Sequence, residues 1–384
     1  MPWLTPETVR ALQRHDTDAR LAALDRFTAT PLPTPQQEIW RYSRIGELRL
    51  DDYALGALAT TVADGDGWVV DTTTAPPAAA ADFGHELDLF AELNRALGTP
   101  IHIRIPRGTV VETPIVITHT LETDGAAAFP RLVIEAGEDS EVTVIELFAS
   151  ADDISGIVMP VLQVRAEQSA RVRYLAVNEL GNKVWQIANQ QSIGERDSTT
   201  LLSTVALGGD YARVRTHASL VGQGGSTRQV ALYFADGTQT HDFRTTQEHI
   251  APKTFSDLLF KGAVNDQSRS VYTGLIKIGP EARGTQAFQT NRNLTLSDGA
   301  WAESVPNLEI ETNDVKCSHA STVGPIDEDQ RFYLESRGIQ PDIAERLVVL
   351  GFFDEVLAQL PVGAHADELR ERISKKLHQA VVAV

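Results

Sequence analysis

The chain has 384 residues, of which 42% are hydrophobic and 22% are charged, as is ordinary for a folded globular protein. Its formal net charge of -18 argues against nucleic acid or an anionic membrane as a partner, because both attract concentrated Lys and Arg. One cysteine excludes an internal disulfide, the first residues do not read as a signal peptide, and no segment approaches the roughly 20 apolar residues of a membrane span. We therefore expect a cytoplasmic protein.

The first part of the chain, residues 1–98, is predicted to be a helical region with a connector. Residues 5–28 have apolar residues at helical spacing, and Thr5 is in the right place to cap the helix. A second helix is expected over residues 86–97, ending at a glycine. The segment between them, residues 66–84, has the Ala, Pro and Thr content of a connector.

Residues 101–308 form a succession of short segments rich in Val, Ile, Leu, Tyr and Thr, which predicts strands. No amphipathic segment of helical length interrupts them, so a doubly wound α/β fold with crossover helices is excluded. Two all-β solutions remain: a sandwich or barrel joined by hairpins, or a solenoid of stacked coils. The Asp-Gly pairs at 124, 236 and 298 suit hairpins, whereas the length favours a solenoid, and no clear sequence repeat decides between them.

The last part of the chain is again helical in pattern. Residues 327–338 predict a helix that ends at Gly338, Pro341 opens a second helix, and a third begins near Asp367. Apolar stripes of this kind fit a packed core and a docking surface equally well, because a short helical tail has little mass of its own to bury them.

The only cysteine, Cys317, is followed two residues later by His319 in a segment that reads as a strand. Side chains at positions i and i+2 of a strand share one face, so the thiol and the imidazole are predicted to point the same way. Both are common ligands of soft and borderline metals. On spacing alone, however, such a pair is more often a small buried residue beside a hydrogen-bonded histidine.

Signatures of common catalytic sites are missing from the sequence. It contains no GxxxxGK[ST], HExxH, CxxC or GxSxG. The glycine cluster at residues 221–230 lacks the lysine that would reach a phosphate, so it reads as a turn. Nothing in the residues indicates catalysis by this chain alone.

Several longer sequence blocks, read together, are similar to blocks of one known family: QEIWRYS at 37–43, FAELNRALGTPIHIRIPRGTVVETPIVI at 90–117, HIAPKTFSDLLFKGAV at 249–264, QTNRNLTLSD at 289–298, VKCSHAST at 315–322, FYLESRGI at 332–339 and GFFDEVL at 351–357. They resemble the SufB/SufD family of iron–sulfur cluster assembly scaffolds. Within it the chain is similar to the SufD branch. It lacks the cysteine that the SufB branch carries near Arg292, and it has Ala320 where that branch has a glutamate.

This resemblance implies a mainly β fold, with a right-handed parallel β-helix core at residues 99–322 between the helical region 1–98 and a C-terminal helical domain at 323–384. It also implies a non-catalytic scaffold subunit. Such a subunit pairs with a SufB-like subunit through the β-helix and docks a SufC-like ATPase, which supplies the energy, through its C-terminal helices. The sequence leaves open whether the isolated chain is a homodimer or a monomer, although an open solenoid normally needs its edge covered. The expected contacts with the ATPase are Phe352, Phe353, Val356 and Leu357.

The number of thiols limits the metal chemistry of this chain. An iron–sulfur cluster usually needs about four ligands, mostly thiolates, and the chain has one. A site shared between subunits would supply the ligands that this chain lacks. The resemblance implies that His319 contributes a nitrogen ligand and that the SufB-like partner contributes thiolates, with Cys317 as a further metal-site residue. The cluster is then transient, and we expect no cofactor to be bound stably by this chain alone.

Two other functions remain open at this stage. A β-helical carbohydrate-active enzyme of the pectate-lyase kind is one, since parallel β-helices often carry such sites, although a secreted enzyme would need an export signal. The other is a purely structural interaction protein in which His319 has no chemical role.

Overall fold

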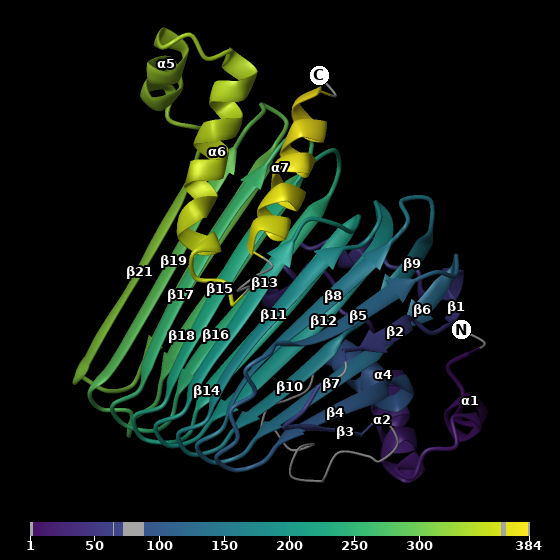
Figure 1. The fold of residues 1–384 in the computed structure, drawn as a ribbon. Coiled ribbons are helices and arrows are strands. Elements are labelled where there is room, and N and C mark those ends of the chain that lie inside the picture. Colours follow the sequence, from purple (N-terminus) through teal and green to yellow (C-terminus); the bar gives the residue numbers. More distant parts are fainter. Residues whose placement is uncertain (1–2, 64, 72–87, 362–365, 383–384) are drawn as a thin grey trace.

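The computed structural model describes residues 3–63, 65–71, 88–361 and 366–382. Within them, two long β-sheets face each other and form a β-solenoid of about eight turns, with helices at both ends of the chain (Figure 1). The prediction of a mainly β solenoid is thus confirmed. Most of the predicted connector and the expected first residues of the second helix lie outside the described residues.

Sheet A and sheet B divide the strands between them, and successive coils add one long strand to each sheet. Sheet A runs in the order β20 (Trp301–Ile310), β18 (Arg269–Ile278), β16 (Thr240–His249), β14 (Tyr211–Leu220), β12 (Lys183–Gly194), β10 (Val161–Ala166), β7 (Pro130–Ala136), β4 (Thr99–Ile105) and β3 (Val69–Asp71), with β9 (Ser155–Val158), β6 (Ala126–Ala128) and β1 (Ala54–Leu55) branching from β12. Sheet B runs in the order β2 (Ala59–Val62), β5 (Ile115–Leu121), β8 (Glu141–Ser150), β11 (Arg171–Glu179), β13 (Thr199–Ala206), β15 (Ser226–Ala235), β17 (Phe255–Val264), β19 (Thr285–Thr295) and β21 (Val315–Gly324).

The long strands pair in parallel, so the hairpins suggested by the Asp-Gly pairs are not formed. These pairs lie instead at corners between coils. The carboxylate of Asp124 accepts a hydrogen bond of 2.7 Å from the backbone N–H of Ser155, which belongs to the next coil. Gly125 and Gly237 have φ angles of +72° and +56°, a conformation that glycine adopts without strain. A glycine-containing turn signal therefore marks a bend here without setting the direction of the next strand.

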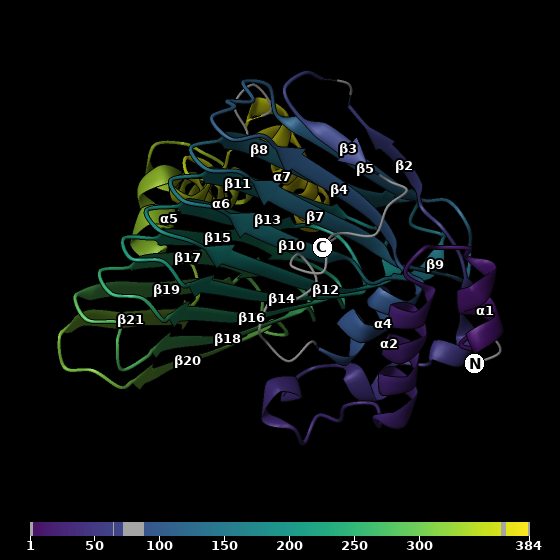
Figure 2. The ribbon, with the colours of Figure 1, turned by 90° about the horizontal axis from the view of Figure 1, so that it is seen from below.

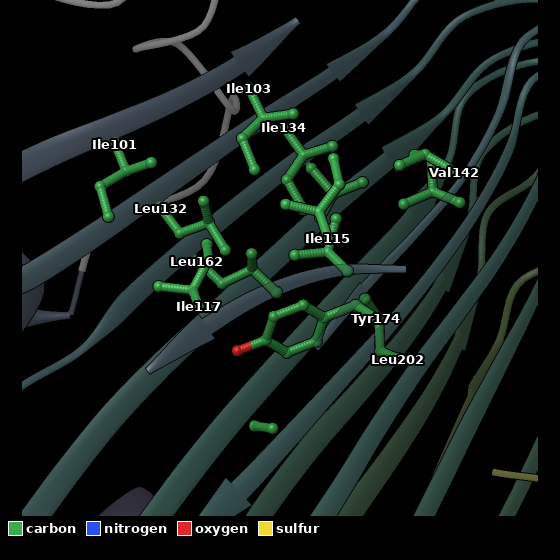
Figure 3. Packing of buried hydrophobic residues seen from close by; sticks show 14 of the residues in the cluster. Ile101, Ile103, Ile115, Ile117, Leu132, Ile134, Val142, Leu162, Tyr174 and Leu202 are labelled. Atoms are coloured by element: carbon green, nitrogen blue, oxygen red, sulfur yellow. The ribbon is translucent and has the colours of Figure 1, made fainter. Parts of the chain in front are cut away.

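The inner faces of the two sheets form the core. In β5 the side chains alternate between buried and half-buried positions, as expected for a strand with one covered face. In the N-terminal coils the covered side chains are almost all aliphatic, and Figure 3 shows Ile103 and Ile134 of sheet A close to Ile115 of sheet B. Burying such side chains stabilises the fold by about 1.5–3 kcal/mol each.

The core becomes aromatic and polar in the C-terminal coils. Tyr233 packs against Phe243 with 4.6 Å between ring centroids, and its hydroxyl donates a hydrogen bond of 2.6 Å to Asn293. The amide of Asn291 donates to the same hydroxyl at 2.9 Å. These side chains are buried, so each hydrogen bond satisfies a group that would otherwise be costly to desolvate.

Close packing around Tyr233 gives a first prediction. Gly262 lies beside Tyr233 in register on the neighbouring strand, and a Cβ there would stand 1.8 Å from Cε2 of the ring. We expect Gly262→Ala to lower the free energy of unfolding by about 1–3 kcal/mol, measured by urea denaturation. The control is Gly324→Ala, where a Cβ would meet nothing within 4 Å, with an expected change of less than about 0.5 kcal/mol. Equal effects of the two substitutions would contradict the prediction.

The C-terminal helices are α5 (Glu328–Ser336), α6 (Pro341–Leu357) and α7 (Ala366–Val382), close to the predicted bounds. Asp327 caps α5 by accepting hydrogen bonds from the backbone N–H groups of Asp329 and Gln330, and Gly338 follows with a φ of +86°. Helices α6 and α7 lie side by side on the outer face of sheet B (Figure 1).

The N-terminal segments cover the outer face of sheet A, on the opposite side of the solenoid from α6 and α7 (Figure 2). They are α1 (Pro6–Ala11), α2 (Thr17–Ala29), η1 (Glu38–Trp40), η2 (Ile45–Glu47), η3 (Leu50–Asp52) and α4 (Leu89–Leu97). Their aromatic side chains, among them Trp40 and Phe90, pack on Trp185 and Tyr211 of the sheet.

Three expectations for this region need correction. The single helix predicted over residues 5–28 is two helices, because Gln13 has a φ of +52° that a helix cannot accommodate. Thr5 does cap the first of them, as predicted. Helix α4 begins at Leu89, capped by Asp88. The region also contributes strands β1, β2 and β3 to the sheets, which its sequence did not predict. Among the described helices none is long and apolar enough to cross a membrane.

Candidate functional site

The last strand of each sheet, β20 in sheet A and β21 in sheet B, forms the C-terminal end of the solenoid. In the described part of the chain, β20 pairs only with β18 and β21 only with β19. All ten residues of each of these two strands are half-buried or exposed. An edge of this kind presents a row of free backbone N–H and C=O groups to which another strand can pair.

Cys317 and His319 lie on β21, as the sequence predicted. His319 is in register with Gln289 of β19, and the same column continues inward through Leu258, Gln229 and Leu202. Because Leu202 belongs to the core between the sheets, this column faces the interior. Two residues before His319 on the same strand, Cys317 faces the interior as well. The thiol and the imidazole therefore share the inner face at the open end.

The environments of these two side chains differ. Cys317 is half-buried and packs against an apolar cluster that includes Ile276, Ile278 and Ala287, whereas His319 is exposed. Burial raises the pKa of the Cys317 thiol above its ordinary value. A thiol in this setting is mostly protonated at neutral pH, so within this chain alone it is a poor nucleophile and a poor metal ligand.

Polar side chains line the interior directly beneath His319. The amide nitrogen of Gln289 donates a hydrogen bond of 2.5 Å to the hydroxyl of Tyr272, which lies 3.0 Å from the hydroxyl of Thr245. All three residues are buried. This network could not be predicted from the sequence, because its members come from three different strands and meet only when the coils stack.

The donor set at this end is small. Among the described residues, no group of three or more His, Cys, Asp or Glu side chains is placed to hold a metal ion. One sulfur and one imidazole are suitable ligand types for iron, but they are fewer than the roughly four that an iron–sulfur cluster usually needs. The residues present therefore fit part of a cluster site.

The C-terminal helices carry a second exposed feature. A cavity of about 980 Å³ opens between α5, α6 and the end of β19. Apolar side chains are exposed on the same two helices: Phe332 at 70%, Tyr333 at 58%, Leu347 at 44% and Ile343 at 37%. Phe332 and Tyr333 begin the sequence block FYLESRGI, but their exposure could not be read from it.

The four expected docking residues all lie on α6, and three of them are buried in this chain. Phe353, Val356 and Leu357 are buried in the cluster that packs α6 on sheet B, so a partner cannot reach them while the helix is seated. Only Phe352 is half-exposed, and it lines the cavity. Lys261 of β17 fixes this arrangement by donating to the carbonyl oxygen of Phe352 at 2.9 Å and pairing with Glu355 at 2.6 Å.

The sequence was compared with protein families and with known proteins, and it matches both. Residues 119–352 match the family model described as "SUF system FeS cluster assembly, SufBD core domain". An iron–sulfur cluster assembly SufBD family protein of Mycobacterium tuberculosis is 33% identical over 378 residues, which covers 94% of this chain and 92% of the relative. The iron–sulfur cluster assembly protein SufD of Escherichia coli is 27% identical over 388 residues, with coverage of 92% and 91%. SufD of Bacillus subtilis is 30% identical over 277 residues, which covers 71% of this chain and 63% of that protein. With a family match over more than half of its length, the chain belongs to the SufBD family of iron–sulfur cluster assembly proteins.

Proposed function

We propose that this chain is a SufD-like scaffold subunit that does no catalysis itself and builds clusters at a site shared with a SufB-like subunit. The observation that carries the proposal is the open end of the solenoid, where β20 and β21 have free edges and β21 bears His319 and Cys317 on its inner face. Strands added to these edges from a partner would bring its inner face up to His319. A second copy of this chain could occupy the same edges when the partner is absent.

His319 would contribute one nitrogen ligand, and the partner would contribute thiolates. Imidazole binds iron but exchanges more readily than thiolate, which suits a scaffold that must release its cargo. Cys317 is a weaker candidate, because its pKa is raised by burial. The cluster is cargo in this scheme, and the chain keeps no cofactor of its own.

The energy for assembly would come from a SufC-like ATPase docked on helices α5 and α6. The exposed side chains Phe332, Tyr333, Ile343 and Leu347 and the adjacent cavity support this placement. It replaces the docking residues expected from the sequence by others on the same helical domain. Family membership favours this role over a carbohydrate-active enzyme of the pectate-lyase kind. A cytoplasmic location remains a prediction.

The test is His319→Ala in the complex reconstituted with SufB-like and SufC-like subunits. We expect the iron and sulfide retained after anaerobic assembly to fall by at least about tenfold, because even the loss of groups that orient metal ligands costs that much. Size-exclusion chromatography should show that the complex still forms. The control is His15→Ala, which changes an exposed histidine far from β21. Full iron and sulfide content with His319→Ala would favour a purely structural interaction protein.

A further inference from the structure

Gln289 is the immediate neighbour of His319 on the inner face of sheet B. The two residues are in register on the parallel strands β19 and β21. Neighbouring strands lie about 4.8 Å apart, so side chains in register on one face stand next to each other. Gln289 is only 2% exposed, whereas His319 is at the surface. The two residues are therefore neighbours on this face, with the glutamine buried and the imidazole exposed.

The nitrogen end of the Gln289 amide is held in place. It donates to the hydroxyl of Tyr272, a residue with no exposed surface, and that hydroxyl is also within 3.0 Å of the hydroxyl of Thr245. Gly274 makes room for this contact: a Cβ at that position would stand 1.9 Å from the amide nitrogen and 2.2 Å from the Tyr272 oxygen. The orientation of the amide follows, because its nitrogen points toward sheet A.

The oxygen end of the same amide is buried and has no hydrogen-bond partner within the described part of the chain, so the His319 ring does not donate to it in the conformer described. Leaving such an oxygen unsatisfied is costly, because it has lost its hydrogen bonds to water. Of the two in-register neighbours of Gln289, Leu258 has no side-chain donor and His319 has a ring N–H. The imidazole is therefore the side chain in this column that can satisfy the oxygen.

We propose that Gln289 is a positioning residue for His319: when the exposed imidazole turns toward it, the Gln289 side-chain oxygen accepts the ring N–H and so fixes the tautomer. The other ring nitrogen then keeps its lone pair and points toward the open end, where cargo would bind. Tyr272 and Gly274 act through Gln289. Tyr272 accepts the amide N–H and Gly274 leaves room for this contact, so the amide oxygen remains available to the imidazole. This inference rests on the proposed role of His319 as a ligand.

The test reads the tautomer directly, in the full chain labelled with ¹⁵N-histidine and without metal. Long-range ¹H–¹⁵N correlation, with His319→Ala for assignment, should show one tautomer for His319 in the wild type. Gln289→Met keeps the length of the side chain but removes the acceptor, so His319 should shift to a mixture of tautomers. In Gln289→Glu an acceptor oxygen is retained, and the single tautomer should return.

Gln229→Met is the matched control. Gln229 lies in the same column, is 1% exposed and also has an amide oxygen with no hydrogen-bond partner among the described residues, but Leu258 separates it from Gln289 and His319. This substitution should leave the tautomer of His319 unchanged. A mixture of tautomers in the wild type would overturn the proposal even if Gln289→Met does not fold. An unchanged single tautomer in folded Gln289→Met would overturn it too.

The iron affinity of the reconstituted complex gives the second readout. Gln289→Met should weaken Fe²⁺ binding by about tenfold relative to Gln229→Met. The failures of the two proposals can be told apart. If Gln289 fixes the tautomer but His319→Ala retains its iron and sulfide, the ligand role of His319 is wrong and the contact is structural. If His319→Ala loses them while the tautomer does not depend on Gln289, the positioning role is wrong and the assembly function stands.

Discussion

Replacing Asp242 by alanine is expected to lower the free energy of unfolding by about 3–5 kcal/mol, because it leaves two buried positive charges without their counter-ion. The Asp242 carboxylate has no exposed surface and lies 2.6 Å from a guanidinium nitrogen of Arg213 and 2.6 Å from one of Arg244. It also accepts a hydrogen bond of 2.8 Å from Tyr211.

The same two arginines hold the N-terminal region on the solenoid. Arg213 donates to the carbonyl oxygen of Ile39 at 2.8 Å and lies 3.7 Å from the ring centre of Trp40, and Arg244 donates to the carbonyl oxygen of Arg41. Asp242→Ala should therefore also disturb the contact between Arg213 and Trp40. Urea denaturation followed by tryptophan fluorescence should detect this change as well as the lower free energy of unfolding.

The control for Asp242 is an ion pair at the surface. Arg107 is 73% exposed and lies 3.2 Å from Glu138, so Arg107→Ala should cost less than about 1 kcal/mol. A cost for Asp242→Ala that is no larger than this would show that the buried ions are not a major source of stability.

The effect of Asp242→Ala should depend on pH. Burial alone would raise the pKa of Asp242, but Arg213 and Arg244 outweigh it and hold the pKa below its ordinary value. A carboxyl group whose pKa is lower in the folded state stabilises the protein fully above its unfolded pKa of about 3.9. The stabilisation is lost as the pH falls below that value. The difference between wild type and variant should thus be smaller at pH 3 than at pH 7.

The double substitution Phe332→Ala with Tyr333→Ala should weaken binding of the SufC-like ATPase by at least about a hundredfold. Aromatic side chains buried at the centre of an interface commonly contribute about 2 kcal/mol or more each. Both side chains are mostly exposed in this chain, so the thermal unfolding temperature should change little. Isothermal titration calorimetry with the purified ATPase measures the affinity.

A double variant at the other end of the molecule serves as the control. Val69 and Val110 are 56% and 59% exposed and lie near the first coil, so Val69→Ala with Val110→Ala should leave ATPase binding unchanged. If the aromatic double variant binds as tightly as the wild type, the docking surface lies elsewhere on the protein.

Local patterns predicted the elements of this fold well. Asp327, Gly338 and Pro341 mark helix ends through the hydrogen-bonding and dihedral preferences of single residues, and the structure confirms them. The shared face of Cys317 and His319 followed from the two-residue period of a strand. These features depend on neighbours in sequence, which a sequence displays directly.

Features that depend on stacking were not predictable in this way. The column that contains Leu202, Gln229, Leu258 and Gln289 mixes apolar and polar residues. The sequence therefore shows no repeat with the period of one coil. The solenoid was inferred only from resemblance to a family. Likewise, an apolar stripe on α6 does not indicate which surface covers it: the sequence allows either a partner or sheet B to cover Phe353, and in this chain it packs on sheet B.

The two ends of the solenoid are unequal. At the N-terminal end, β2 and β3 are strands of four and three residues that run antiparallel to β5 and β4. At the other end, β20 and β21 each offer ten residues. Among the described residues, only the C-terminal end therefore offers two long free edges for strand pairing. If a partner adds its strands there, as we propose, the pair has no second edge of this kind to extend, so its geometry disfavours growth into fibres.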